Sequence, residues 1–351
     1  MKFRKAVSLM SAMVMILCAF SACGAQADEI ETETSVLSDA ETEYESEEAD
    51  GEYVPVTIEN YNRTVEFTEK PERVVVLTLN SAEIVAALGE ADSIVAIARN
   101  CNTVEDILPE YYDDLKDCDF PDEVNNGIPT LESILSLDPD LVICNSYYFN
   151  APQIFGTLED YEENGIQFYI TEGSYVTNCT IENTYNDIRN ISAIFGKEDE
   201  AEALIDSMEE RLETVATTVD GQESLRVMSF DSMNEDEFTV AGGVGLAQYL
   251  IEAAGGTNIF SDTDSQFLSV SIEEIIARDP EVIVIHAYTY LGDEDAQGKI
   301  DYLYNTAELS EVTAIKNNNI IVVPLFQVNP SIQNVDYVES LAAAMYPELF
   351  E

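Results

Sequence analysis

Basic residues, histidine and tryptophan are scarce in this 351-residue chain. It contains 15 Lys and Arg against 69 Asp and Glu, one histidine and no tryptophan, and its net charge is −54. So negative a chain repels the phosphates of nucleic acids and of anionic membrane surfaces, so neither is an expected partner. One histidine also disfavours a site for bare zinc or manganese, which would need several His ligands and a carboxylate.

Recognisable catalytic motifs are absent as well. The sequence has no HExxH motif and no Ser-His-Asp set with a plausible nucleophile elbow. The glycine run 242–245 fails the GxGxxG test of a dinucleotide site, because Gln248 occupies the third position. The cysteines after Cys23 lack the spacing of an iron–sulfur centre. We therefore expect a protein that is not an enzyme and carries no cofactor.

Two of these cysteines leave an alternative open. Cys101 and Cys118 lie close enough in sequence to pair in an oxidising compartment, and unpaired thiols are the other outcome. Spacing alone does not decide between the two. Cys144, at a strand end, and Cys179 are expected to be buried thiols.

The N-terminus has the features of an export signal. A basic head in residues 2–5 precedes an apolar run too short to span a bilayer, and the run ends in Phe20-Ser21-Ala22-Cys23. This end resembles a lipobox, so residues 1–22 are a predicted lipoprotein signal peptide and Cys23 the lipidated residue. Ordinary secretion with cleavage after Ala27 is the alternative. The expected location is the extracytoplasmic face of the cell membrane, with a lipid anchor.

Residues 23–55 form a strongly acidic segment. From residue 24 onward it has twelve Asp and Glu, no Lys or Arg, and few apolar residues at helix or strand period. Such a segment does not bury enough apolar surface to offset its ordering entropy, so we predict a disordered linker.

The remaining chain alternates strand and helix patterns around one long helix. Continuous apolar runs predict strands at 73–78, 93–98, 141–145 and 167–171, and later at 226–230, 238–241, 281–286 and 320–324. Helices are expected at 82–88, 131–137, 245–254, 272–277 and 335–345. Residues 198–219 carry the i, i+3, i+4, i+7 stripe of a helix about 33 Å long.

The two parts of the chain also share a repeat. Residues 130–145 align without gaps on residues 271–286, with Glu, Ile, Asp and Pro identical. The fold prediction is therefore α/β, with two Rossmann-like lobes at 56–197 and 220–351, each a mainly parallel sheet flanked by helices. Helix 198–219 joins them, and a ligand cleft lies between them.

Several stretches of this body together resemble one family. They are residues 70–77 (KPERVVVL), residues 82–89 (AEIVAALG), the two Asp-Pro repeats and residues 346–350 (YPELF). In this order they resemble the substrate-binding lipoproteins of ABC importers, in the helical-backbone class that delivers iron siderophores, haem or cobalamin. The resemblance covers about residues 56–351. It implies a monomer that hands a small-molecule metal complex to a permease driven by an ATPase.

Ligand-binding candidates follow from the position of the loops. In open α/β sheets a ligand binds beyond the carboxyl ends of the strands. The candidate residues there are mostly aromatic or neutral-polar, which fits a large, mostly neutral metal chelate. They are Asn80, Ser81, Arg99, Asn126, Tyr147, Tyr148 and Tyr175 in the first lobe, and Met233, Phe267, His286, Tyr288 and Phe326 in the second.

Two of these residues bear on the cargo. His286 is either an axial ligand to haem iron or cobalt or a hydrogen-bonded residue at a strand end, and the second reading is preferred. Arg99 is the only arginine expected near the crevice, whereas anionic catecholate or citrate chelates usually need several. Hydroxamate chelates, cobalamin and haem remain as cargoes. The resembled family most often carries iron–siderophore complexes, so the expected cargo is an iron–siderophore complex, then a corrinoid, then haem.

Permease docking is assigned by the resemblance to one glutamate of each lobe. Glu132 and Glu273 occupy the same place in the two repeats, in the first turn of a helix. A helix dipole favours a carboxylate there in any case. In the family, glutamates in this motif meet arginines of the two permease subunits, so Glu132 and Glu273 are the predicted docking residues.

Overall fold

The computed structural model describes residues 53–99, 102–120, 128–234 and 237–350. Residues 51–351 form one compact unit. The predicted signal peptide, Cys23, Cys101, Asn126 and nearly all of the predicted linker lie outside the described residues. Within the described ranges, no helix combines the length and the apolar character needed to cross a membrane.

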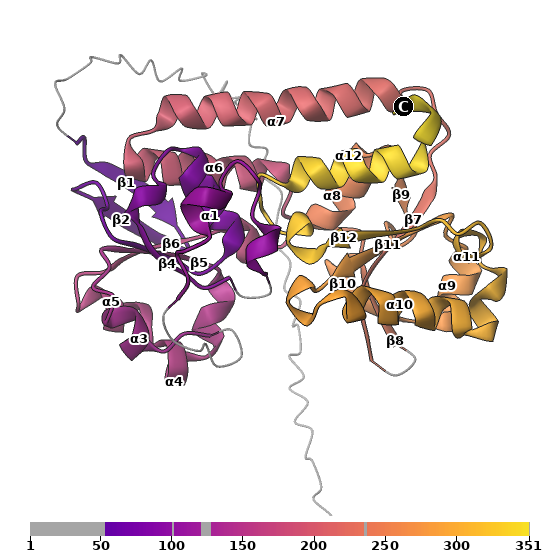
Figure 1. The fold of residues 1–351 in the computed structure, drawn as a ribbon, viewed down its shortest axis with the longest axis horizontal. Helices are drawn as coiled ribbons and strands as arrows, with labels where there is room; N and C mark the ends of the chain where they lie inside the picture. The colour runs from indigo at the N-terminus through magenta and orange to yellow at the C-terminus, as the bar shows by residue number, and fades with distance from the viewer. Residues whose placement is uncertain (1–52, 100–101, 121–127, 235–236, 351) are drawn as a thin grey trace, which may run out of the picture. The chain divides into compact units, whose positions relative to one another are not determined.

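The first sheet is parallel throughout. Its strand order is β4-β3-β5-β6, with β3 Val74–Val76, β4 Ile94–Ile97, β5 Leu141–Cys144 and β6 Gln167–Ile170. All four strands lie where continuous apolar runs predicted them, because both faces of the sheet are covered. The helices of this part are α1 Leu79–Ala87, α2 Tyr112–Leu115, α3 Leu131–Leu135, α4 Pro152–Phe155, α5 Leu158–Glu162 and α6 Ile181–Phe195 (Figure 1).

A hairpin that the sequence analysis did not predict precedes this sheet. Strands β1 Val56–Asn60 and β2 Arg63–Phe67 pair antiparallel. Tyr61 and Asn62 between them have φ values of 51° and 58°, as a tight hairpin turn requires. Asn60 then joins the hairpin to the first sheet, since its amide donates to the Ile170 carbonyl at 2.8 Å.

The second sheet is mixed. Its order is β10-β8-β7-β11-β12, and β9 also pairs with β7. The strands are β7 Arg226–Asn234, β8 Glu237–Ala241, β9 Thr257–Asn258, β10 Phe267–Ser271, β11 Val282–Ala287 and β12 Ile320–Pro324. Strands β7, β11 and β12 are parallel, as predicted, and the short β9, which was not predicted, is parallel to β7. Strand β8 is antiparallel to both of its neighbours, β7 and β10. For β7 the reason is the short connection: Asn234 pairs with Glu237, which leaves no room for a crossover.

Helices surround the second sheet as well. They are α8 Leu246–Ala253, α9 Ile272–Arg278, α10 Asp293–Asn305, α11 Thr313–Lys316 and α12 Asn334–Met345. Helix α10 was not predicted; its apolar positions are few, and Lys299 and Leu303 are its buried residues.

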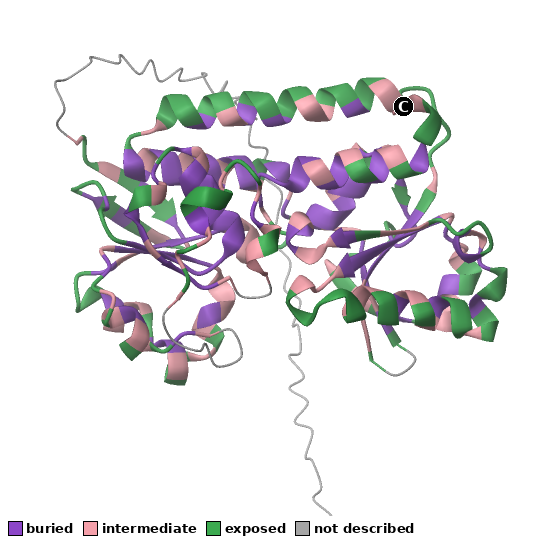
Figure 2. Ribbon diagram, viewed as in Figure 1, coloured by how far each residue is buried: buried purple, intermediate pink, exposed green. Residues whose placement is uncertain are grey.

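Helix α7, Glu198–Val219, has the predicted bounds. Gly196 caps the preceding α6 in the left-handed conformation, with φ 66° and ψ 48°. The buried residues of α7 are Ala201, Ile205, Met208 and Val215, and the helix packs on α6, α8 and α12. Figures 1 and 2 show this arrangement, with the outer face of α7 largely exposed.

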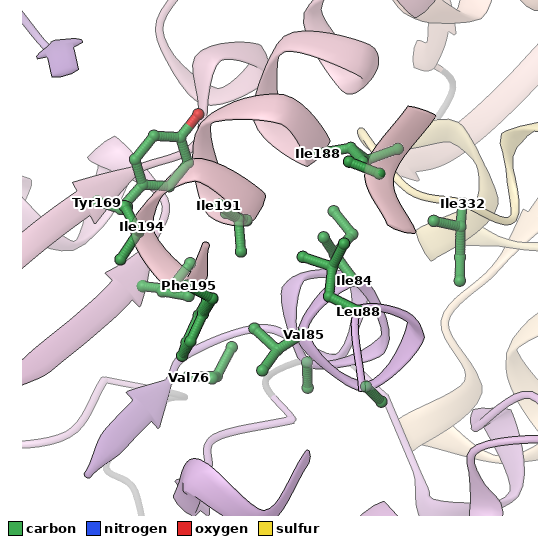
Figure 3. Close-up of a cluster of buried hydrophobic side chains, with 14 of the residues drawn as sticks. Val76, Ile84, Val85, Leu88, Tyr169, Ile188, Ile191, Ile194, Phe195 and Ile332 are labelled. Atoms are coloured by element: carbon green, nitrogen blue, oxygen red, sulfur yellow. The ribbon is translucent and has the colours of Figure 1, made fainter. Parts of the chain in front are cut away.

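The hydrophobic core links the two parts of the chain. Ile205 and Met208 of α7 belong to the core around the first sheet, and Val215 belongs to a core of the second. Ile332 and Val335, which follow β12, also pack in the first core, where Ile332 shares a cluster with residues of α1 and α6 (Figure 3). The chain after β12 is therefore anchored in both parts.

The sequence repeat is present in three dimensions. The hydroxyls of Thr130 and Ser271 cap α3 and α9, each accepting from the backbone N–H three residues on. Asp138 and Asp279, at identical repeat positions, have φ values of 50° and 45°. Both helix-to-strand turns therefore share one unusual backbone conformation.

An arginine holds each of these turns in the same way. Arg73 Nε donates to the Asp138 carbonyl at 2.8 Å, and Arg226 Nε donates to the Asp279 carbonyl at 2.9 Å. The carboxylates of Asp140 and Glu281 accept from the backbone N–H groups of the two arginines. The helix-to-strand turn of the second part thus copies that of the first in backbone conformation and in contacts.

Candidate functional site

Asn80 and Phe326 are two predicted ligand-binding residues that the structure brings together. The Asn80 amide donates to the Phe326 carbonyl at 2.9 Å, and both residues are buried. Ser81, beside them, is buried too, and its backbone N–H donates to the Thr78 hydroxyl at the start of α1. The bond between Asn80 and Phe326 joins the two parts of the chain, and all three residues have little exposed surface.

Arg99 is engaged within its own loop region. Its Nη2 donates to the carbonyls of Leu115 and Lys116 at 3.1 and 3.0 Å. Its Nη1 forms an ion pair with Asp119, and the arginine side chain is 10% exposed. Burial lowers the pKa of the guanidinium. Arg99 therefore offers little charge to an anionic ligand.

The three predicted tyrosines of the first part differ in exposure. Tyr148 is fully buried, and its hydroxyl donates to the Leu77 carbonyl at 2.7 Å. Tyr147 is half-buried and stacks on Tyr148 with ring centroids 4.4 Å apart. Tyr175 is half-buried and meets Tyr61 edge to face at 5.2 Å. Tyr147 and Tyr175 therefore present aromatic surface, and the buried Tyr148 packs against the ring of Tyr147.

In the second part, Phe267 and Met233 also present apolar surface. Phe267, at the start of β10, is 44% exposed, and Met233, near the end of β7, is half-buried. Exposed tyrosine and leucine side chains follow β11 at Tyr290 and Leu291. An aromatic side chain that stays in contact with water is a common element of binding surfaces.

His286 lies at the predicted strand end but points into the protein. It is fully buried, with its Nε2 2.8 Å from the Ser229 hydroxyl and its Nδ1 3.6 Å from an Asp231 oxygen. Ser229, His286 and Asp231 are therefore neighbours, but His286 Nδ1 has no hydrogen-bond partner among the described residues. Ser229 is also fully buried, in the middle of β7, so its hydroxyl meets no substrate. In this conformation His286 is likewise out of reach of an iron or cobalt centre.

Residues that the sequence analysis did not nominate join the two parts. Gln333 Nε2 donates to both carboxylate oxygens of Glu83, at 2.9 Å each, and the Leu108 N–H donates to one of them at 2.8 Å. The Thr289 hydroxyl donates to the Asp106 carboxylate at 2.6 Å. The available sequence signal was Glu83 itself, the one charged residue in the apolar run 82–88.

The predicted docking glutamates, Glu132 and Glu273, are both exposed in the first turns of α3 and α9. The Cys118 thiol is free, while Cys101 lies outside the described residues. Cys144 and Cys179 are buried as predicted, and burial raises the pKa of the Cys179 thiol to about 12.

Every Lys and Arg in the described ranges is already engaged by a carboxylate or a backbone carbonyl. Arg73 hydrogen bonds to carbonyls. The others form ion pairs: Arg63, Lys70, Arg99, Lys116, Arg189, Lys197, Arg211, Arg226, Arg278, Lys299 and Lys316. A strongly anionic ligand would have to displace one of these partners, which a neutral or cationic ligand does not require.

Comparison with known proteins gives a family match and several similar chains. A family model described as periplasmic binding protein matches residues 74–325. The "Vitamin B12-binding protein" of Vibrio parahaemolyticus is 27% identical over 72% of this chain and 81% of its own length. The ABC transporter substrate-binding lipoprotein YvrC of Bacillus subtilis is 22% identical over 99% of both chains.

Solved structures share the fold. A periplasmic binding protein from Veillonella parvula superposes with a TM-score of 0.71 at 22% identity, over 85% of this chain and 99% of that chain. This likeness extends over both sheets and the helices that flank them.

Proposed function

The chain belongs to the periplasmic binding protein family, and from this premise we propose that it captures a corrinoid between its two parts. It is a substrate-binding protein of an ABC importer, in the class that serves siderophores, cobalamin or haem, and it is not an enzyme. Its partners are a permease and a small-molecule cargo. Delivery of that cargo from outside the cytoplasm is its role in transport.

The main observation behind the proposal is that every described Lys and Arg already contacts a carboxylate or a backbone carbonyl. A corrinoid is a large macrocycle whose rim bears neutral amides, so it needs aromatic surface and neutral hydrogen-bonding groups rather than unpaired cations. Tyr147, Tyr175 and Tyr288, which follow the carboxyl ends of strands, and Phe267, at the start of β10, supply such groups. A relative of this chain is named as a vitamin B12-binding protein, which favours a corrinoid over the iron–siderophore complex that the sequence analysis placed first.

A ferric hydroxamate is the second candidate, because it too lacks a large negative charge. Haem fits less well: its two propionates require cations, and His286 is buried behind Asp231 and Ser229. Ferric catecholates fit least, since their negative charge would compete for arginines already paired with carboxylates.

The remaining parts of the proposal concern the membrane. Cys23 carries the lipid that anchors the chain at the cell membrane, and residues 23–55 act as the linker. Glu132 and Glu273 dock on the two permease subunits, whose ATPases drive uptake, and the protein acts as a monomer. The exposure of both glutamates in equivalent first turns supports this assignment.

A fluorescence screen tests the cargo. The chain has 18 tyrosines and no tryptophan, so bound metal complexes are expected to quench tyrosine emission. Titration with cyanocobalamin, a ferric hydroxamate, a ferric catecholate and haem should give saturable quenching at micromolar cyanocobalamin. A saturable response to the hydroxamate alone would support the second candidate, and silence with all four would refute the transport proposal.

A further inference from the structure

Tyr288 is held at three separate points. It follows β11, is one of the predicted ligand-binding residues, and is half-buried. Its backbone N–H donates to the Asp295 carboxylate at 2.9 Å, and its hydroxyl donates to Asp231 at 3.0 Å. The Lys299 ammonium lies 4.5 Å from the centre of its ring. Backbone, ring and hydroxyl are therefore each fixed by a charged side chain.

Lys299 is itself fixed in a buried position. Its ammonium donates to the His286 carbonyl at 2.6 Å and to Asp295 at 2.9 Å, and its side chain is 7% exposed. Asp295 therefore joins Lys299 to the Tyr288 backbone. The attraction between a cation and the face of an aromatic ring is stronger when both are withdrawn from water.

Asp231 also lies close to the buried His286. Its Oδ1 lies 3.6 Å from His286 Nδ1, while its Oδ2 accepts from the Tyr288 hydroxyl. His286 Nε2 is in turn 2.8 Å from the Ser229 hydroxyl. The Asp231 carboxylate is 13% exposed. Ser229, His286 and Asp231 thus lie in series behind the hydroxyl of Tyr288, one of the predicted ligand-binding tyrosines.

Stability alone is a poor explanation for this arrangement. Removing charges from water costs several kcal/mol for each ion, and apolar residues of similar volume are often as stabilising as a buried ion pair. All the charged side chains of this group converge on one half-buried aromatic residue. Holding a recognition residue in its bound conformation reduces the ordering cost of binding.

We propose that Asp231 and Lys299 are positioning residues that hold Tyr288 in the orientation in which it contacts the cargo. The inference rests on the proposed function, since it assigns residues to that same site. It also gives His286 a role: the histidine orients Asp231, and through it Tyr288, without touching the metal.

A double-mutant cycle tests the positioning role. The variants are Tyr288→Phe, Asp231→Asn and their combination, with cyanocobalamin and a ferric hydroxamate as the probes. Tyr288→Phe removes the hydroxyl that donates to Asp231, and Asp231→Asn removes the charge of the acceptor, so each single substitution should weaken binding about tenfold. The double variant should be no weaker than either single variant, because Asp231 acts only through the Tyr288 hydroxyl. Asp301→Asn, at an exposed carboxylate of the same helix α10, is the control and should leave affinity unchanged.

The outcomes separate the two proposals. If the wild-type chain binds neither probe, the proposed function and this inference both fail. If it binds but the two substitutions add, or Asp231→Asn has no effect, the positioning role alone is refuted. Asp231→Glu keeps the charge beside His286 and shifts the carboxylate by one methylene, so it replaces the Asn variant in the cycle if that variant does not fold.

Discussion

Glu83 is a carboxyl group in an unusual place, fully buried in helix α1. Burial raises its pKa to about 7, opposed by the hydrogen bonds from Gln333 and Leu108 and reinforced by the charges of Asp336 and Glu110. Arg211 forms an ion pair with Asp336, one of these two neighbouring carboxylates. Asp187, buried in α6, has its pKa raised to about 7 by burial as well.

The raised pKa of Glu83 predicts how stability depends on pH. The folded protein keeps this proton up to about pH 7, whereas the unfolded chain releases it near 4.5. The contribution of Glu83 to the free energy of unfolding is thus complete below pH 4.5 and is lost as pH rises to about 7, a change of about 3 kcal/mol at most. Urea denaturation of Glu83→Gln between pH 4.5 and 8 should show a shallower decline than wild type.

The control for this prediction is Glu69→Gln, an exposed glutamate that is not among the groups that shift the pKa of Glu83. It should keep the wild-type slope. Parallel pH profiles for wild type and Glu83→Gln would show that Glu83 has an ordinary pKa.

At the level of single residues, sequence reasoning located side chains well and their partners poorly. The apolar run at residues 281–286 correctly predicted that His286 lies near the end of a strand. Its burial follows from the sheet, since every residue from Val282 to His286 is buried, and a run without alternation gives no sign of which face a side chain meets. The partner of Arg99, Asp119, comes from a different turn of the same loop region, and no period in the sequence connects the two.

Among the elements, one close contact between the two parts of the chain is a glycine against a proline. Gly173, after β6, faces Pro330, after β12, and a Cβ atom on Gly173 would lie 1.9 Å from Pro330 Cγ. Residues 326–335 also contribute the contacts of Phe326 with Asn80 and of Gln333 with Glu83. This segment is therefore a second connection between the parts, in addition to α7.

Gly173→Ala should loosen that connection. The added methyl group has no space, so the alanine should reduce the free energy of unfolding by about 1–3 kcal/mol, as overpacking does. Gly298→Ala in α10 is the matched control: its Cβ would meet nothing within 4 Å, and the change should stabilise the helix by about 0.5–1 kcal/mol. Thermal unfolding of both variants measures the difference, and equal melting temperatures would refute the close contact.

Elements with a strong pattern could be predicted, and those with a weak one could not. Helix α7 has eight apolar positions in register over its length, and its bounds agree with the prediction. The hairpin β1–β2 pairs strands of five residues around Tyr61 and Asn62, without the Asn-Gly signal that makes such turns recognisable. Helix α10 has few apolar residues because much of it is exposed, and its buried polar residue, Lys299, looks like a surface residue in the sequence.

For the whole molecule, the repeat bears on the proposed docking to the permease. The same cap, the same aspartate conformation and the same arginine contact recur beside Glu132 and Glu273. Two exposed carboxylates in equivalent places match a pair of permease subunits related by a twofold axis. The sequence repeat predicted this correspondence; the exposure of both glutamates required the structure.

Charge reversal at both glutamates tests the docking role. Glu132→Arg with Glu273→Arg should leave cargo affinity within about twofold and abolish ATPase stimulation in vesicles that contain the cognate permease, because like charges would face each other at the interface. The charge-matched control is Glu159→Arg with Glu308→Arg, two exposed glutamates also in first helical turns. Stimulation that survives the first pair, or fails equally with both pairs, would place docking elsewhere.

The central claim, that the chain binds a corrinoid, is tested most directly by isothermal titration of the mature chain with cyanocobalamin. The account predicts one corrinoid bound per chain with a dissociation constant in the micromolar range or below, little affected by ionic strength because no unpaired cation holds the cargo. No detectable heat up to 100 micromolar cyanocobalamin, with tight and salt-sensitive binding of an anionic ferric catecholate, would contradict it.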